Sequence, residues 1–315
     1  PGVKIDLQLV AYQALQSRMN AALQSGAPVP DLAEVWNLGY FLKGPLENVQ
    51  LVDLTDRIKR DHLDEQMVAT RFAMWSSKGR IFGLPHDLHP VVLVYRRDIL
   101  EKEGIDPKSI QTWDDFVRIA HQLGKDKDGD GKPDRYALDV PTSGENQTLS
   151  LLVFQRGGQL INERGEVAFD TEDIADLICW YVENLEGKDP IFYSLVQSRG
   201  GGRSQSLTKA VEDGFIVFLL AADWRTKHIQ NDFGRVSGLM EAMPLPEWTP
   251  GGCRTSTAGG TCLVITKQCK NVDLAWKLAK FLYTSPDGLE ERYNETNIIP
   301  PVKALWQMPF FDKPN

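Results

Sequence analysis

A run of aspartates at residues 125–138, KDKDGDGKPDRYAL, has a spacing that suits a hard cation. The candidate ligands are Asp126, Asp128, Asp130, Lys132 and Asp134. In a calcium-type loop alternate residues supply oxygens, and a glycine, here Gly131, takes the sharp turn. The EF-hand pattern also needs a bidentate Glu at the twelfth place, where this chain has Ala137. We therefore expect either a weakly bound structural calcium ion or a solvated connector between a helix and a strand.

Three further carboxylates, Asp87, Glu145 and Asp223, could in principle supply the acid and base of a glycoside hydrolase. The sequence has no nucleophile elbow, no metal-binding His/Glu cluster and no phosphate-binding loop. The glycine-rich SRGGGRS at 198–204 has no strand before it, so we interpret it as a surface loop. We expect no enzymatic activity and no required cofactor.

Composition narrows the class of protein further. The 315 residues suggest about two domains. The 35 basic and 43 acidic residues give a net charge of −8, and no basic run is interleaved with aromatics, which argues against nucleic-acid binding. No apolar stretch approaches the length of a membrane span. No signal peptide is visible at Pro1, and we expect that the chain has been cut there.

The cysteines do not have the spacing of a zinc site. They are Cys179, Cys253, Cys262 and Cys269. We expect small buried residues or a single opportunistic disulfide.

The elements that must position these residues begin with a strand, a helix and a second strand. Residues 3–9 alternate apolar and polar side chains, which predicts a strand with one buried face. A stripe of helical period follows and stops at Gly26, and VPDLAEVW at 29–36 resumes a strand.

The alternation continues along the chain. Continuous apolar runs predict buried strands at 91–95 and 215–222, and Thr112 with Asp115 predicts a capped helix start. Further helices are predicted at about 147–156, at about 171–186, from 208, and after Asn271, with a strand at 261–267. Alternating strands and helices predict an α/β protein with mostly parallel sheets. Because no linker is visible, we expect the chain to cross between two domains more than once.

The segment GLPHDLHPVVLVYRRDILEKEGID at 83–106 resembles the family 1 extracellular solute-binding proteins, the sugar-binding subunits of ABC importers, which include maltose-binding proteins. Other segments follow in that family's order at 25–41, 112–138, 211–224, 259–283 and 293–302. The resemblance covers nearly the whole chain. Compared with the family, we expect the chain to be truncated at both ends.

The resemblance implies a type II periplasmic-binding-protein fold with two lobes. Each lobe would be a mostly parallel sheet flanked by helices, with a ligand cleft between the lobes that closes on binding. The predicted partition is 1–88 plus 250–292 for lobe one and 92–246 plus 296–315 for lobe two, with crossings near 89–91, 247–249 and 293–295.

The resemblance also implies a function. The protein would capture a sugar or oligosaccharide and deliver it to the transmembrane subunits of an ABC permease. It would act as a monomer outside the cytoplasm, either in the periplasm or lipid-anchored at the outer face of the cell membrane. The alternative within this fold is a receptor that presents its ligand to a sensor or chemoreceptor. The few basic residues near the candidate site favour a neutral sugar over a polyol, a uronate or a sugar phosphate.

A sugar has apolar ring faces and a rim of hydroxyls, so its site needs aromatic plates and short polar side chains. Trp224 is the leading candidate because the buried strand ends just before it and because the family places a stacking aromatic there. Trp36 also ends a predicted strand and is either a second plate or a core residue. Similarity to maltose-binding members implies a ligand-contacting carboxylate at Glu145.

The other ligand-binding candidates lie near the ends of predicted strands and in connecting loops. They are Asn37, Tyr40, His86, Asp87, His89, Asn146, Asp223, Arg225, Gly259, Gly260, Asn297 and Trp306. Several have an ordinary structural alternative. The histidines could be satisfied structural residues, the glycines could form a tight turn, and Arg225 could pair with Asp223 instead of with hydroxyls or an anionic group.

Overall fold

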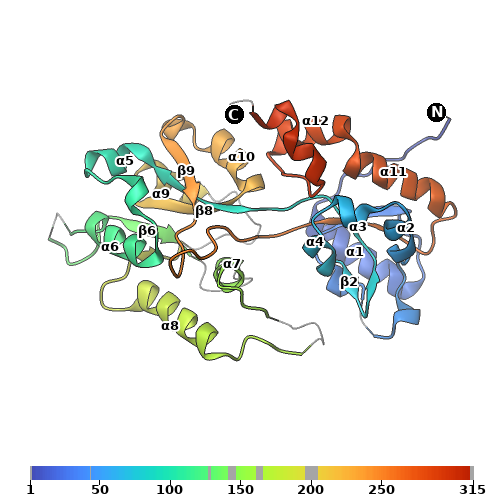
Figure 1. Ribbon diagram of the computed structural model, residues 1–315, viewed down its shortest axis with the longest axis horizontal. Coiled ribbons are helices and arrows are strands. Elements are labelled where there is room, and N and C mark those ends of the chain that lie inside the picture. Colours follow the sequence, from blue (N-terminus) through green and yellow to red (C-terminus); the bar gives the residue numbers. More distant parts are fainter. Residues whose placement is uncertain are drawn as a thin grey trace. The chain divides into compact units, whose positions relative to one another are not determined.

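The computed structural model describes residues 2–42, 44–126, 129–140, 147–160, 166–195 and 205–312. The chain forms two compact units (Figure 1). The first unit comprises Pro1–Leu88 and Gly259–Asn315, and the second unit comprises His89–Ala258. Within the described ranges, every helix is too short or too polar to traverse a lipid bilayer.

The first unit is built on a three-stranded sheet. Its helices and strands are α1 (Tyr12–Ser25), β1 (Leu32–Val35), α2 (Thr55–Arg60), α3 (Leu63–Gln66), α4 (Thr70–Ala73), β2 (Ser76–Ser77), β3 (Arg80–Ile81), β4 (Leu84–Pro85), β10 (Cys262–Ile265), α11 (Val272–Thr284) and α12 (Pro286–Thr296). The strand order is β1-β10-β4, so the central strand comes from the second part of the chain.

The central strand of this sheet is buried on both faces. The side chains of Cys262 and Val264 belong to the core cluster that includes Met19 of α1. Leu263 and Ile265 belong to a second cluster with buried residues of α2, α3 and α11. Because successive residues of a strand point to opposite faces, one short apolar strand joins two layers of helices.

The second unit is built on a five-stranded sheet with the order β7-β6-β8-β5-β9. Its helices and strands are β5 (Val91–Arg96), α5 (Arg97–Lys102), α6 (Trp113–Leu123), β6 (Tyr136–Asp139), α7 (Gln147–Gln155), α8 (Glu172–Glu186), β7 (Phe192–Tyr193), α9 (Gln205–Glu212), β8 (Ile216–Ala222), α10 (Asp223–Asp232) and β9 (Met240–Pro244). The α/β class expected from the sequence is confirmed.

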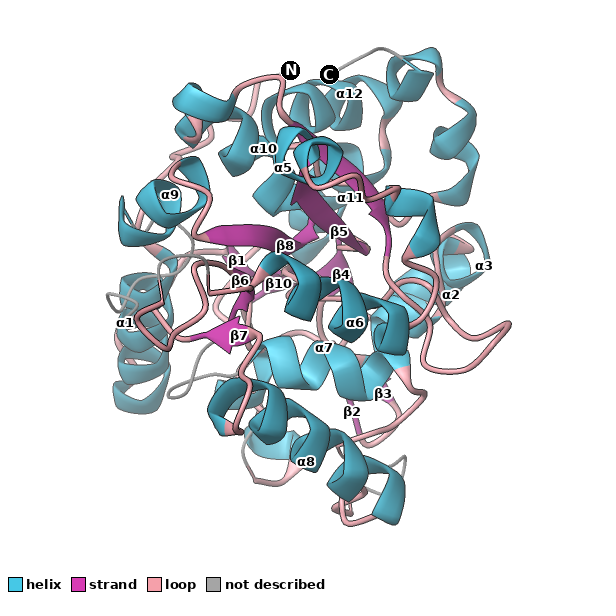
Figure 2. Cartoon of the chain, turned by 90° about the vertical axis from the view of Figure 1, so that its left-hand side faces the viewer, coloured by secondary structure: helices cyan, strands magenta, loops and turns pink. Residues whose placement is uncertain are grey.

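Helices cover both faces of the second sheet. Figure 2 shows α9 and α10 on one side of β5 and β8, and α6, α7 and α8 on the other. The side chains of Val91, Leu93 and Tyr95 pack on the side of α6 to α8, whereas Val94 packs on the side of α9 and α10. Burial on both faces explains why these strands read as continuous apolar runs in the sequence.

Local capping signals are also confirmed. The side chain of Thr112 accepts a hydrogen bond from the backbone N–H of Asp115, and the Asp115 carboxylate accepts one from the backbone N–H of Thr112. Asn271 caps α11 by accepting from the backbone N–H of Leu274. Such reciprocal bonds satisfy amides that the first turn of a helix leaves unpaired.

The sheets are less parallel than expected. β10 is antiparallel to both β1 and β4, and β5 is antiparallel to both β8 and β9. The pairings of β6 with β7 and β8 are parallel. A parallel pairing needs a crossover connection, usually a helix. β5 and β10 begin within a few residues of the points where the chain enters each unit, so no crossover helix precedes them there.

The strand expected at residues 3–9 is wrong. This segment is assigned to no strand, and its apolar side chains are exposed, from 56% for Val3 to 100% for Leu9. An alternating pattern becomes a stable strand only when a neighbour supplies backbone partners and a surface covers the apolar face. No described strand pairs with this segment.

The units also divide the chain differently from the predicted lobes. Residues 296–315 belong to the first unit, because Val302 packs in the same core cluster as Leu54 and its backbone bridges to Met67. Residues 250–258 belong to the second unit. The chain therefore changes unit twice, after Leu88 and after Ala258. Residues 297–312 form only 3₁₀ turns. Their sequence therefore has no helical or strand periodicity from which their unit could be predicted.

All four cysteines are free, so no disulfide forms. Cys262 and Cys269 are buried, whereas Cys179 and Cys253 are exposed. The expectation of buried residues therefore holds for two of the four.

Candidate functional site

In the second unit, the candidate residues meet at the junction of β8 and α10. β8 ends at Ala222, and Asp223, Trp224 and Arg225 form the first turn of α10. β6 runs parallel to β8 and ends at Asp139 on the same edge of the sheet. The carboxyl ends of the strands in open α/β sheets are the usual place for a ligand.

The indole of Trp224 is fixed on one side by the protein. It is partly buried and packs against the large core cluster of the second unit. Its Nε1 lies 3.4 Å from the carbonyl oxygen of Ala258, to which it donates, and the ring of His228 meets it edge-on at 5.8 Å. These contacts hold the indole in one orientation, as a stacking plate requires.

Asp223 is paired with His89. The Nδ1 atom of His89 lies 2.7 Å from Oδ1 of Asp223, and both side chains are buried. The same Oδ1 accepts a hydrogen bond from the backbone N–H of Trp224 at 2.7 Å. His89 has a positive φ of 52°, a strained conformation for a residue that is not glycine. The alternative that Arg225 pairs with Asp223 is therefore wrong.

In the first unit, Asp87 is fully buried and paired with an arginine. Its Oδ1 lies 2.5 Å from Nη2 of Arg71, and its Oδ2 accepts a hydrogen bond from the backbone N–H of Thr261 at 2.7 Å. Arg71 Nε also donates to the carbonyl of Asp87. Because the guanidinium is itself buried, these bonds compensate two charges that would otherwise be costly.

His86 belongs to a polar cluster on the same unit. Its Nδ1 accepts from Nη1 of Arg292 at 2.7 Å, and its ring lies 4.9 Å from that of Tyr283. The hydroxyl of Tyr283 donates to Glu34 of β1 at 2.5 Å. Burial raises the pKa of the Tyr283 hydroxyl well above its usual value, and the charge of Glu34 adds to this. These contacts hold β1, α11 and α12 of the first unit together.

Gly259 and Gly260 both have positive φ, 90° and 144°. A Cβ on Gly260 would lie 2.3 Å from Nη2 of Arg71. Here the absence of a side chain makes room for the buried arginine, and the carbonyl of Gly259 accepts from the same Nη2 at 3.4 Å.

The remaining candidates of the first unit lie in different places. Trp36 directly follows β1 and is partly buried, and Asn37 caps a 3₁₀ turn by accepting from the backbone N–H of Gly39. Tyr40, at the end of that turn, is 43% exposed. Asn297 is buried in the left-handed position that ends α12, and Nε1 of Trp306 donates to the carbonyl of Pro300.

Some candidates cannot be placed. Asp128, Glu145, Asn146 and the 198–204 segment lie outside the described residues. In the rest of the aspartate loop, Asp126 accepts from the backbone N–H of Gly129 and of Gly131, and Asp130 accepts from that of Lys132. Among the described residues, no group of His, Cys, Asp and Glu is arranged to hold a metal ion. These aspartates therefore form a hydrogen-bonded turn, and the suggestion of calcium gains no support.

Sequence reasoning missed the partners of the first-unit candidates. They are Glu34, Arg71, Thr261, Tyr283 and Arg292. The sequence could have pointed to Glu34, which is a charged residue inside the short apolar strand LAEV. The paired glycines 259–260 gave another, since glycine often marks a close approach by another group.

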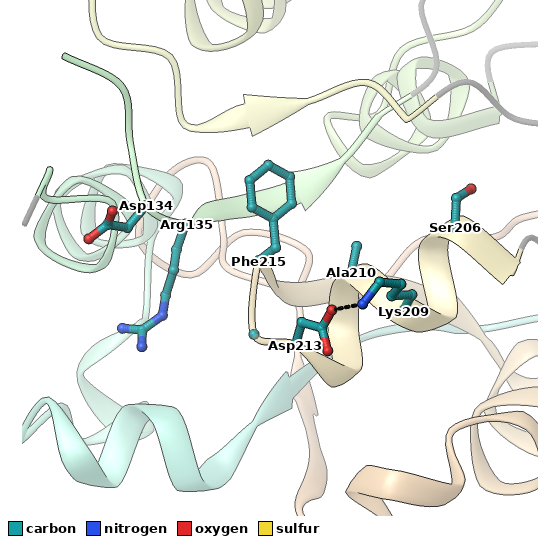
Figure 3. A pocket seen from close by; sticks show the side chains of 8 residues that line it. Asp134, Arg135, Ser206, Lys209, Ala210, Asp213 and Phe215 are labelled. Atoms are coloured by element: carbon teal, nitrogen blue, oxygen red, sulfur yellow. Dashed lines mark hydrogen bonds and ion pairs between the residues drawn. The ribbon is translucent and has the colours of Figure 1, made fainter. Parts of the chain in front are cut away.

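A cavity of about 690 Å³ lies elsewhere on the second unit (Figure 3). Asp134 and Arg135 precede β6, and Gly214 and Phe215 precede β8, so it opens at the amino ends of these strands. Of its charged side chains, Lys209 pairs with Asp213. Among the described residues that line it, Phe215 is the one aromatic side chain, which is fewer than a sugar site needs.

The fold and the β8–α10 junction define a two-unit α/β binding protein. The sequence matches, over residues 2–314, the family described as bacterial extracellular solute-binding protein, and the chain belongs to that family. It is 25% identical to an arabinooligosaccharide-binding protein from Halalkalibacterium halodurans, over 99% of this chain and 67% of the relative.

Solved structures show the same fold. The sugar-binding protein MalE from Xanthomonas citri has a TM-score of 0.78 at 20% identity, over 98% of this chain and 75% of that one. An ABC transporter associated binding protein from B. animalis subsp. lactis Bl-04, solved in complex with β-1,6-galactobiose, has a TM-score of 0.74 at 20% identity, over 98% and 72% of the two chains. The family and fold expected from the sequence are confirmed.

Proposed function

We propose that this solute-binding protein captures a sugar or oligosaccharide outside the cytoplasm and delivers it to an ABC-type permease. The observation that carries the proposal is the tryptophan at the carboxyl end of β8, held by the Ala258 carbonyl and His228 at the start of α10. An indole fixed in this way can cover the weakly polar face of a pyranose or furanose ring. The sugars named for the relatives and structural neighbours support the same class of ligand.

The ligand class can be tested by thermal unfolding of the full-length protein with arabino-, galacto- and malto-oligosaccharides. A ligand at 100 times its Kd stabilises the folded state by about 2.7 kcal/mol, which shifts the melting temperature measurably. Amino acids and short peptides serve as control solutes. Stabilisation by one of these controls and by no saccharide would overturn the proposal.

Delivery to a permease needs a separate test. In proteoliposomes that contain a candidate ABC permease from the same organism, the sugar-loaded protein should stimulate ATP hydrolysis more than the sugar-free protein does. Equal hydrolysis with and without sugar would instead favour a protein that presents its ligand to a sensor.

A further inference from the structure

Arg225 also lies at the β8–α10 junction. The proposed function does not explain why its guanidinium has no partner among the residues described there. Its side chain is partly buried in the first turn of α10, directly after Trp224. Within the part of the chain that the structure describes, its guanidinium donates no hydrogen bond and forms no ion pair, because Asp223 is taken by His89.

The other arginines show how unusual this is. Each described arginine that is buried or partly buried, apart from Arg225, has a hydrogen-bond or ion-pair partner. They are Arg57, Arg71, Arg96, Arg97, Arg135, Arg156, Arg254 and Arg292. Arg18 also has no partner, but its side chain is exposed and water serves it. Arg225 therefore combines partial burial with unused donors.

This combination is costly for the free protein. Burial lowers the pKa of the Arg225 guanidinium below its usual value, and the Asp139 carboxylate acts in the opposite direction. Arginine nevertheless stays protonated, so a partly buried cation with five N–H donors has no protein partner among the described residues. Oδ1 of Asp139 itself accepts from the backbone N–H of Leu195 at 2.9 Å. Polar groups that lie at strand ends without hydrogen-bond partners are typical of binding sites.

We propose that Arg225 binds an anionic substituent of the sugar, so that the preferred ligand is an acidic saccharide. This inference rests on the proposed function and names the substrate class of the same site. A guanidinium presents two parallel N–H groups that match a carboxylate or a phosphate, whereas a neutral hydroxyl takes only one of them. Trp224, the preceding residue of the same turn, would cover the ring face. The start of α10 adds a favourable field for a negative charge.

The proposal reverses the expectation of a neutral sugar. That expectation counted basic residues near the site, whereas the proposal considers whether each cation already has a partner. A single arginine without an ion-pair partner is a stronger attraction for an anion than several that are already neutralised.

The test compares sugars that differ only in the group at carbon 6 of each ring. Calorimetric titration of the full-length protein would use galactose, galacturonate and galactose 6-phosphate, the matching glucose series, and galactobiose with digalacturonate. We expect at least one acidic sugar to bind tenfold or more tightly than its neutral counterpart. The uronate and phosphate arms show which acid is recognised, and the preference should weaken as salt is added.

Substitutions then test whether the preference for acidic sugars depends on Arg225. Arg225→Gln should remove the preference for the acidic sugar, and Arg225→Lys should keep part of it. Arg254→Gln, which changes another partly buried arginine of the same unit, should leave the preference intact. If Arg225→Gln does not fold, the salt dependence of the parent and the lysine variant still decide the matter.

The outcomes separate this inference from the proposed function. Equal or tighter binding of neutral sugars would overturn the role of Arg225 while the capture of sugars stands. Equal weakening of acidic and neutral sugars by Arg225→Gln would also overturn it. Binding of no sugar, acidic or neutral, would overturn both proposals.

Discussion

The two units use polar residues near their strand ends in different ways. In the first unit, Asp87 and His86 are bound by Arg71, Thr261 and Arg292. In the second unit, Trp224 and Arg225 begin a helix at the end of a strand, and the guanidinium of Arg225 has no partner among the described residues. Asp223 of the second unit is likewise paired with a buried His89, so the contrast concerns Trp224 and Arg225, for which we propose a role in binding. We expect changes in the first unit to lower stability and changes at the β8–α10 junction to lower affinity.

The strongest test of this contrast is Asp87→Ala. The change leaves the Arg71 guanidinium buried without its counter-charge, and breaking a buried pair in this way costs about 3–5 kcal/mol. Urea unfolding measures the loss. Glu101→Ala is the control, since it removes an exposed pair with Arg97 and should cost less than about 1 kcal/mol. A stable Asp87→Ala protein with weakened sugar binding would place Asp87 among the ligand contacts and break the contrast.

Gly260→Ala probes the same support from the backbone. At a φ of 144° an alanine is strained, and its Cβ would overlap Nη2 of Arg71. We expect a loss of about 3 kcal/mol in the free energy of unfolding, at the upper end for a strained position. Gly251→Ala, with a φ of 80° and open space around it, should cost clearly less. Equal losses for the two variants would show that Arg71 moves aside freely.

Tyr95 tests how much a hydrogen bond between a buried phenol and an exposed carboxylate contributes to stability in the second unit. Burial, with a hydrogen bond to Glu241 at 2.8 Å, raises the pKa of Tyr95 to about 12. The folded state therefore favours the protonated phenol, and this stabilisation is full below the unfolded pKa near 10 and is lost as the pH rises toward 12.

At about 1.4 kcal/mol per pKa unit, we expect a loss of roughly 2 kcal/mol by about pH 12. Unfolding measured between pH 9 and 12 should show a shallower decline for Tyr95→Phe than for the parent. Identical slopes would mean that Tyr95 ionises in the folded state as it does in a peptide.

Trp224→Ala has the smallest expected effect in free energy and the most direct bearing on function. Loss of about 100 Å² of apolar contact at 25 cal/mol per Å² predicts a fall in sugar affinity of roughly ten- to a hundredfold. Trp248→Ala, which removes another partly buried tryptophan packed on the same core, should lower stability and leave affinity unchanged. The assignment fails if Trp224→Ala unfolds, or if it binds sugar as tightly as the parent.

Local signals predicted the second unit well. The apolar runs at β5 and β8 and the capping box of α6 depend on residues close in sequence, and each was found where expected. The position of Trp224 at a strand end followed from the same reasoning. What no local pattern carries is the pairing of His89 with Asp223, because 134 residues separate them.

The same limit explains the errors in the first unit. The alternation at residues 3–9 resembles that of any half-buried strand, yet pairing depends on a neighbour that local sequence does not specify. The return of residues 297–312 to this unit depends on long-range contacts such as Met67 with Val302. Likewise, the sequence reveals an arginine at position 225 but not whether a carboxylate lies within its reach.

The central position of β10 has a consequence for how the chain folds. β1 and β4 pair with β10 and not with each other, and Leu32 meets Ile265 across 233 positions of sequence. During synthesis the described strands of the first-unit sheet therefore cannot pair until residues 262–265 emerge, whereas the second unit, His89–Ala258, is continuous in sequence. Because distant pairings close slowly, we expect the second unit to fold first and the first unit to wait, exposed to chaperones, for its middle strand.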